Sequence, residues 1–302
     1  MTESPLKLVP LTRSLTFVEG DQQGRFPRAN ALLVHDGGLN VLIDTGCGEG
    51  VLRALQAAHP IDYVICTHSH LDHISGNWLF PERPIWMPAG IAFETAGSAA
   101  RLAARFADDP DIQRRWLETT VPYVGFRDTP PTDAYPPGHV FEIGRVKLHS
   151  IPAPGHLTDH TCFWEPESGT LLATDIDFTG FGPWYGNPES DPTQFEESIR
   201  RVWGLHPRTV ISSHKGVFRE DLDRQFEAYL AHFARREQAI LAALELPRTL
   251  AELEDLAIIY GRFPRAEEML RYFERVMIAK HLARLEQQGQ VYRVEPGLWR
   301  AG

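Results

Sequence analysis

The sequence has few cysteines, no long apolar run and no excess of positive charge, and each shortage excludes a class of protein. Three cysteines among 302 residues cannot form a disulfide framework, so we expect a reducing compartment. No run of about 18 consecutive apolar residues is present, which excludes a membrane-spanning helix. The first residues, MTESPLKLVPLTRSLTF, lack the apolar core of a signal peptide. We therefore expect a cytoplasmic protein with no membrane partner.

The charge balance disfavours anionic partners. Thirty Lys and Arg against 40 Asp and Glu give a net charge of −10, which makes the whole chain a poor electrostatic partner for nucleic acid. The apolar fraction of 43% is ordinary for a globular protein. Histidine, by contrast, is abundant at 13 residues, and the positions of these residues carry the functional argument.

The length indicates one large domain and a small appendage. A strand-rich αβ pattern covers residues 1–218, beginning with a hairpin over 31–44 that turns at Asp36-Gly37-Gly38. A buried strand ends at Thr67, and a helix begins at Pro192 after Asp191 as its N-cap. Residues 98–138, helical and then Pro-rich, are interpreted as an inserted lid outside the basic sheet.

Residues 219–302 have a different pattern, which is mostly helical. Apolar residues recur there at three-to-four spacing, and Pro247 ends the first long helix. The tail finishes with a helix, a glycine and a short two-stranded segment, the order in which a winged-helix module ends. We therefore predict a second, winged-helix-like domain over 219–302.

The strongest local signal is the run THSHLDH at 67–73, directly after a predicted buried strand. Three imidazoles and one carboxylate within this run supply ligands that suit zinc and similar cations. His156, Asp175 and His214 each follow another predicted strand. Together with the run they supply the ligands of a site for two metals, at the carboxyl ends of the strands.

These segments, in this order and with LIDTG at 42–46, resemble the metallo-β-lactamase superfamily over about residues 10–218. The resemblance implies an α+β fold, a four-layer αββα sandwich with two metals at one edge, here followed by the winged-helix-like region. It implies two divalent cations, zinc first, with iron or manganese as alternatives. The implied ligands are His68, His70 and His156 for the first metal, Asp72, His73 and His214 for the second, and Asp175 with a water or hydroxide bridging both.

The resemblance also implies supporting roles. Asp72 is the implied catalytic residue, because it would orient the nucleophile or pass a proton to the leaving group. Asp44 and Thr67 are expected to hydrogen-bond within the metal loop and fix imidazole tautomers, with an ordinary strand-end turn as the alternative. His160 is interpreted as structural, and Cys66 as a small buried hydrophobe.

The segment after Asp175 is rich in aromatic residues and glycine and is typical of a pocket wall. Such a wall suits an apolar or acyl substrate, although packing of the loop against the core carries equal weight. Lys215 would meet a substrate carboxylate or phosphate, or be solvated. The candidate wall residues are Phe178, Phe181, Trp184 and Tyr185, with Trp116, Tyr123 and Phe126 of the lid completing the pocket.

The sequence thus predicts a dinuclear metal-dependent hydrolase that acts on a small ester, lactone or thioester. Glyoxalase-II-like thioesterases share the histidine run, but the basic glutathione-binding residues of their tail have no match here. Two alternatives stay open: a mononuclear iron persulfide dioxygenase, and a nucleic-acid-binding protein or ribonuclease acting through the tail.

The tail charge bears on the last alternative. Residues 221–302 contain 12 basic and 13 acidic residues, which falls short of the basic footprint of a DNA-binding module. The partner expected is a small-molecule substrate, and the tail is expected to cover the pocket or to form a homodimer. The basic residues of the predicted recognition helix are Arg271, Arg275, Lys280 and Arg284.

Overall fold

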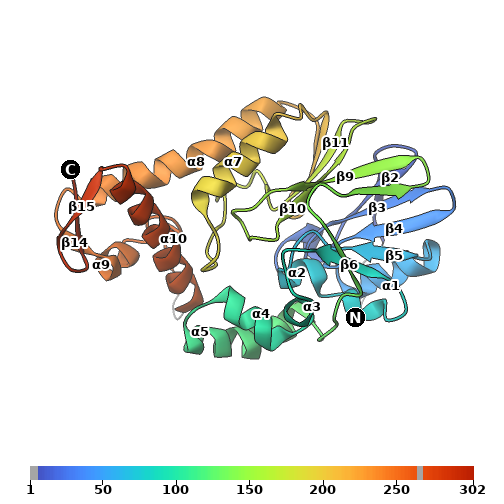
Figure 1. Cartoon of the computed structure of the whole chain (residues 1–302), viewed down its shortest axis with the longest axis horizontal. Coiled ribbons are helices and arrows are strands. Elements are labelled where there is room, and N and C mark those ends of the chain that lie inside the picture. Colours follow the sequence, from blue (N-terminus) through green and yellow to red (C-terminus); the bar gives the residue numbers. More distant parts are fainter. Residues whose placement is uncertain (1–5, 264–267) are drawn as a thin grey trace.

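The computed structural model describes residues 6–263 and 268–302, and it shows two β-sheets packed face to face (Figure 1). The first sheet has its strands in sequence order, antiparallel up to β4 and parallel from β4 onward. Its strands are β1 (Leu8–Pro10), β2 (Leu15–Val18), β3 (Ala31–Asp36), β4 (Leu39–Ile43), β5 (Tyr63–Ile65), β6 (Ile85–Pro88) and β7 (Asp133–Tyr135). The predicted hairpin is confirmed: Gly37 and Gly38 supply the positive φ angles that its turn needs.

The second sheet has the order β13-β12-β11-β10-β9-β8. Its strand pairs are antiparallel except β11 with β12, which run parallel. Its strands are β8 (Val140–Ile143), β9 (Val146–Pro152), β10 (Thr161–Glu165), β11 (Thr170–Thr174), β12 (Thr209–Ser212) and β13 (Gly216–Phe218). Both sheets are therefore mixed.

Alternate residues of the two sheets meet in a core between them. Phe17, Val34 and Ile43 of the first sheet pack with Phe163 and Ile211 of the second, and all five are buried. Full burial of one such side chain contributes about 1.5–3 kcal/mol. This inner core fixes the edge at which the metal-ligand candidates lie.

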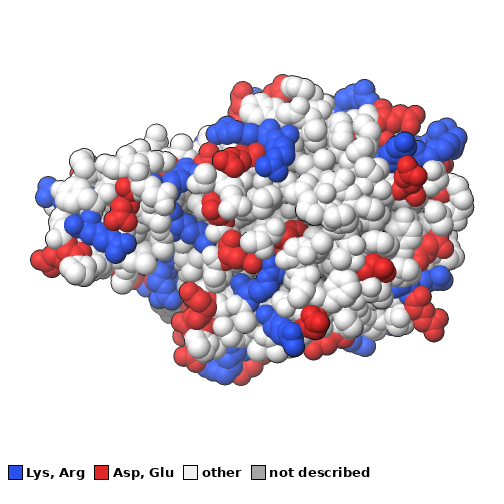
Figure 2. Space-filling view, in the orientation of Figure 1, with Lys and Arg blue, Asp and Glu red and all other residues white. Residues whose placement is uncertain are grey.

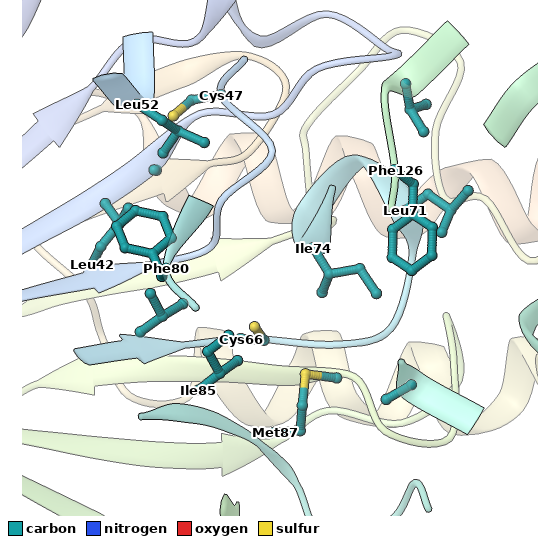
Figure 3. Close-up of a cluster of buried hydrophobic side chains, with 14 of the residues drawn as sticks. Leu42, Cys47, Leu52, Cys66, Leu71, Ile74, Phe80, Ile85, Met87 and Phe126 are labelled. Atoms are coloured by element: carbon teal, nitrogen blue, oxygen red, sulfur yellow. The ribbon is translucent and has the colours of Figure 1, made fainter. Parts of the chain in front are cut away.

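Helices cover the outer face of each sheet, which confirms the predicted αββα layering. α1 (Glu49–Ala58) and α2 (Leu71–Ile74) cover the first sheet over an apolar cluster that includes Leu42, Leu52 and both Cys47 and Cys66 (Figure 3). The second sheet is covered by α7 (Pro192–Trp203) and α8 (Leu222–Ala243). α7 begins as predicted, because the Asp191 side chain accepts hydrogen bonds from the Thr193 and Gln194 amides. Short turns are η1 (Asp21–Gly24) and η2 (Asn77–Leu79).

The predicted lid segment is a series of short helices that contacts the C-terminal region. These are α4 (Ala99–Phe106), α5 (Pro110–Arg115), η3 (Trp116–Thr120) and α6 (Val121–Val124), and the short helix α3 (Phe93–Ala96) precedes them. The Tyr272 hydroxyl donates to Asp108 Oδ1 at 2.8 Å, and the rings of Phe106 and Phe273 lie 5.1 Å apart. The end of the segment differs from the prediction of a lid over 98–138: residues 133–135 form β7, which pairs with β6, so they belong to the sheet.

The C-terminal region is helical with a small sheet, as the coarse pattern predicted. It contains β14 (Arg248–Thr249), α9 (Leu250–Asp255), α10 (Glu268–Gln287), β15 (Val291–Glu295) and β16 (Leu298–Ala301), with the sheet order β14-β16-β15. Among the described residues, no helix combines the length and apolarity needed to cross a bilayer.

The structure does not establish a distinct winged-helix domain beginning at residue 219, because α8 contributes to the buried clusters of both parts of the chain. α8 starts on the second sheet, where Phe226 and Phe233 share a buried cluster with Phe195 of α7, and it then extends into the C-terminal region (Figure 1). Met277 of α10 is buried in the same cluster. The predicted boundary at 218 therefore falls before a helix that belongs to both parts.

Candidate metal centre

The metal-ligand candidates all follow carboxyl ends of strands, at one edge of the sandwich. β5 leads into the histidine run, β9 into His156, β11 into Asp175 and β12 into His214. The run itself divides in two: residues 66–70 are loop, and Leu71–Ile74 form the single turn α2. His68 and His70 therefore lie on the loop, while Asp72 and His73 project from a helical turn.

Gly46 lets this edge close. A Cβ atom at Gly46 would lie 1.4 Å from the backbone carbonyl oxygen of Asp72, so any side chain would push α2 away from the first sheet. The neighbouring Thr45 amide donates to the His73 carbonyl at 2.8 Å. The glycine of the LIDTG segment thus allows close backbone contact beneath the site.

The structure brings the predicted ligand residues together in two groups joined by one carboxylate. Asp175 Oδ2 lies 3.0 Å from His156 Nε2, and Asp175 Oδ1 lies 3.0 Å from His73 Nε2. One oxygen of Asp175 therefore faces each group. In each group the ligand atoms lie within 4.8 Å of one another; the first is His68, His70, His156 and Asp175, and the second is Asp72, His73 and His214.

The donor set fits divalent cations. Among the described residues, Nε2 of His68, Nε2 of His73 and Oδ1 of Asp175 are buried without a hydrogen bond of good geometry, although the last two atoms lie 3.0 Å apart. Buried polar atoms without partners cost about 1–3 kcal/mol each, so a cluster of them is costly in the metal-free chain. Imidazole nitrogen and carboxylate oxygen are ligands that zinc accepts, and cations held by the two groups would satisfy these atoms.

The electrostatics of the cluster point the same way. Burial is the main cause that holds the pKa of His68 and His70 well below the usual 6.5, helped by neighbouring imidazoles. Burial also acts to lower the pKa of His214, but the carboxylates of Asp177 and Asp175 outweigh it and raise that pKa to about 10. The carboxylates therefore favour positive charge at the centre, which a proton supplies in the metal-free chain.

Asp44 and Thr67 hydrogen-bond to one another and contact two imidazoles of the histidine run. Asp44 Oδ2 lies 2.7 Å from His73 Nδ1, and Asp44 also accepts from the Thr67 amide and hydroxyl, each at 2.8 Å. The Thr67 hydroxyl lies 3.0 Å from His68 Nδ1. Because each Nδ1 is engaged by the protein, the Nε2 atoms of His68 and His73 face the cluster.

His160 lies directly behind the centre. Its Nδ1 is 2.7 Å from the Ala153 carbonyl oxygen, and its Nε2 contacts the Thr174 hydroxyl. Burial and the neighbouring His156 lower the pKa of His160 to about 3. Both ring nitrogens are thus used within the chain, in keeping with the structural interpretation.

Sequence reasoning missed several residues that position the ligands. Asn187 Oδ1 lies 2.9 Å from His70 Nε2, and the Trp184 carbonyl oxygen lies 2.9 Å from His156 Nδ1. Asp177 Oδ1 accepts from the Ser212 hydroxyl at 2.6 Å and from the His214 amide at 3.2 Å. Asp177, two residues after Asp175, is the only one of these with a local signal, since both follow the same strand.

The aromatic residues after Asp175 lie in different environments. The Trp184 ring lies 5.6 Å from His70 and 5.7 Å from His156, beside the metal ligands. Phe178 packs against Phe226 and Tyr229 of α8, and Phe181 packs against Tyr260.

Tyr185 differs from the pocket-wall prediction. It is 0% exposed, and its hydroxyl lies 2.6 Å from His281 Nε2 and accepts from Arg236 at 2.8 Å. Tyr185 therefore joins the loop to the C-terminal helices and does not line an open pocket. Lys215 is exposed, next to His214.

The predicted lid residues of the pocket also differ in their burial. Trp116 and Phe126 are buried in the same apolar cluster as Leu71 of α2 (Figure 3 labels Phe126 and Leu71). Tyr123, in contrast, is 60% exposed. Arg105 connects the lid to the centre: its guanidinium donates to the Ser69 hydroxyl at 2.8 Å and to Glu189 at 2.6 Å.

Comparison with known proteins identifies the fold and its relatives. The sequence profile of the metallo-beta-lactamase superfamily matches residues 24–214. An atrochrysone carboxyl ACP thioesterase of Aspergillus fumigatus is 26% identical, over 86% of this chain and 77% of that protein. A hydroxyacylglutathione hydrolase of Acidiphilium cryptum is also 26% identical, over 80% of this chain and 88% of its own length.

Solved structures agree on the fold. A metallo-beta-lactamase family protein from Thermus thermophilus superposes with a TM-score of 0.73 at 23% identity, covering 97% of this chain and 100% of that one. A beta-lactamase domain protein from Burkholderia ambifaria gives a TM-score of 0.72 at 19% identity, covering 98% and 94%. Both cover the C-terminal region as well as the sandwich.

Proposed function

Since the chain belongs to the metallo-β-lactamase superfamily and is a metal-dependent hydrolase of that fold, we propose that it hydrolyses thioesters of apolar acids at a dinuclear centre. The observation that carries the proposal is the single buried carboxylate of Asp175, which directs one oxygen toward each group of ligand atoms. Esters and lactones, which share the acyl carbon chemistry, are the nearest alternatives.

The chemistry at the centre divides between the cations and the chain. Two zinc ions, or iron or manganese in their place, would lower the pKa of a shared water to about neutrality and so supply a nucleophile. His68, His70 and His156 would hold one ion, and Asp72, His73 and His214 the other.

Asp72 would also act on the proton of the reaction. Its Oδ2 lies 3.4 Å from His214 Nε2; Asp72 is 7% exposed, and His214 is partly exposed. A carboxylate there can take the proton of the attacking water and pass it to the departing thiolate.

The preference for an apolar acyl group rests on the surroundings of the first ligand group. Trp184 lies against His70 and His156 and packs 5.2 Å from Phe273. Phe106 of the lid and Met269 of α10 belong to the same apolar cluster. An apolar surface next to the ligands suits a hydrocarbon or aromatic acid. Two relatives are named for thioester substrates, one an acyl carrier protein thioester and the other a glutathione thioester.

Thiol release tests the proposal. Zinc-loaded protein is offered acyl thioesters of N-acetylcysteamine and of glutathione with short, long and aromatic acids, next to matched oxygen esters, lactones, a phosphodiester and RNA. We expect hydrolysis of thioesters, faster for apolar acids, and loss of at least a hundredfold in rate for Asp175→Asn. Selective cleavage of the phosphodiester or RNA would contradict the proposal. One bound iron with sulfite formation from a persulfide would replace it by the dioxygenase.

For the C-terminal region we propose a role in the pocket wall and not in nucleic-acid binding. The basic residues of α10 are already engaged: Arg271 pairs with Asp255, Arg284 pairs with Glu196 and Glu237, and Lys280 donates to two carbonyls. Figure 2 shows acidic and basic side chains intermixed over this region on the face in view. A site for phosphates requires free cations on one face.

Two measurements on the full chain test this role. Fluorescence anisotropy with labelled duplex DNA and RNA is expected to show no electrostatic binding. Binding of that kind would weaken as the salt concentration rises from about 50 to 200 mM. Salt-sensitive binding at micromolar protein would contradict it. The homodimer predicted through the C-terminal region is tested by light scattering on a gel-filtration column, where a monomer mass would contradict the dimer.

A further inference from the structure

Asn187 lies between the metal centre and the lid. Its Oδ1 is 2.9 Å from His70 Nε2, and its Nδ2 donates to the Phe106 carbonyl at 3.1 Å at the end of α4. The residue is 2% exposed, so water does not compete for either group. One amide thus contacts both a ligand candidate and the lid backbone.

The lid backbone determines which end of the amide faces His70. A carbonyl oxygen can only accept, so the carbonyls of Phe106 and Arg105 require the NH₂ end of Asn187 on their side. The amide oxygen must then face His70, where it accepts from Nε2–H. That bond leaves the lone pair of His70 Nδ1 free, and Nδ1 points toward His156 Nε2 at 2.9 Å, into the first ligand group.

We propose that Asn187 is a positioning residue that holds His70 in its metal-binding tautomer, and that the docked lid helix α4 sets the orientation of Asn187. Metal affinity is then coupled to lid docking. The inference rests on the proposed metal centre but not on the proposed substrate.

The segment around Asn187 is held from both sides. On the C-terminal side, Lys280 donates to the carbonyls of Pro188 and Ser190 at 2.8 and 2.6 Å. On the lid side, Arg105 pairs with Glu189 at 2.6 Å and also with Asp159 at 3.2 Å. The backbone that carries the amide is therefore fixed from both sides while the lid is docked, and it loses the Arg105 contact if the lid moves away.

Substitution separates the two contacts of Asn187. Asn187→Ala removes both, whereas Asn187→Asp keeps an acceptor for His70 Nε2–H and loses the donor to the Phe106 carbonyl. A carboxylate behind a ligating imidazole also makes the ring a better metal ligand. Asn40→Ala is the matched control, because Asn40 Nδ2 donates to the Pro60 carbonyl at 3.0 Å far from the centre along the first sheet.

Zinc affinity is measured by competition with a chromogenic chelator on the full-length protein, without substrate. We expect Asn187→Ala to bind zinc about 10- to 100-fold more weakly. Asn187→Asp is expected to bind within about threefold of wild type, and Asn40→Ala likewise. Limited proteolysis within residues 98–125 is expected to be faster in both Asn187 variants than in wild type.

Several outcomes would overturn the inference. Wild-type zinc affinity in Asn187→Ala, or an equal loss in Asn187→Asp and Asn187→Ala, would show that the amide does not set the tautomer. Unchanged lid cleavage in Asn187→Asp would show that the lid contact does not depend on it. Circular dichroism of each variant verifies folding. If Asn187→Ala does not fold, a loss of much more than about threefold in the zinc affinity of folded Asn187→Asp, which keeps the acceptor, would overturn the inference. Wild-type protein that binds zinc but cleaves no thioester would contradict only the proposed substrate.

Discussion

Asp44 contacts the ring nitrogen of His73 that faces away from the ligand cluster: Oδ2 of the carboxylate lies 2.7 Å from Nδ1 of the imidazole. Asp44 has a φ of 64°, a left-handed conformation that Asn also tolerates. Asp44→Asn therefore removes the negative charge with little backbone cost. We expect zinc affinity to fall about 10- to 100-fold, measured by chelator competition.

A distant carboxylate gives the control for Asp44. Asp62 Oδ2 accepts a hydrogen bond from the backbone amide of Asn40 at 2.8 Å, and neither residue belongs to the ligand groups. Asp62→Asn is expected to bind zinc as wild type does. Equal affinity in wild type and Asp44→Asn would show that the carboxylate does not support the ligand.

The buried hydroxyl of Tyr185 predicts a stability effect. It joins His281 and Arg236, so Tyr185→Phe leaves a buried guanidinium and an imidazole each short of one partner. We expect a loss of about 1–3 kcal/mol in the free energy of unfolding by urea. Tyr123→Phe, at a site 60% exposed, is expected to change it by no more than about 0.5 kcal/mol. Similar effects of both variants would contradict the importance of this contact.

The three cysteines are predicted to be unreactive in the folded protein. All are buried, and burial raises the pKa of Cys47 and Cys162 to about 12 and that of Cys66 further still. The thiolate is the reactive form, so Ellman's reagent is expected to titrate none of the three before unfolding and all three in urea. Rapid reaction of a native thiol would contradict the burial, and it would also interfere with the thiol-release assay.

Metal removal is predicted to destabilise the chain without abolishing the sandwich. Cations bound only by the folded state stabilise it by about 4 kcal/mol when their concentration is a thousand times the Kd. A chelator is therefore expected to lower the Tm, zinc is expected to restore it, and Asp175→Asn is expected to show a smaller shift. The far-ultraviolet circular dichroism should persist, because the core between the sheets contains none of the ligands. Identical melting curves with and without zinc would contradict the metal centre.

The sequence was informative where chemistry is local. The histidine run, Asp175 and His214 each begin within two residues of the end of a strand, so their meeting at one edge could be predicted from strand ends alone. Asn187 and His70 are 117 residues apart, and no local pattern connects them. The sequence does not distinguish Tyr185 from its aromatic neighbours. Its hydroxyl contacts Arg236 and His281, which lie 51 and 96 residues further along the chain. The strand β7 lies in a Pro-rich stretch and could not be predicted, because three residues at a sheet edge show too little alternation of apolar and polar residues.

The course of α8 has a practical consequence for anyone preparing fragments. A chain cut at residue 218 would lack α8 and would uncover the buried apolar cluster that α8 shares with Phe195 of α7. Such an exposed apolar face favours aggregation over solubility. A soluble fragment of the catalytic sandwich has to extend to about Ala243, and any hinge between the two ends of the molecule has to bend a continuous helix.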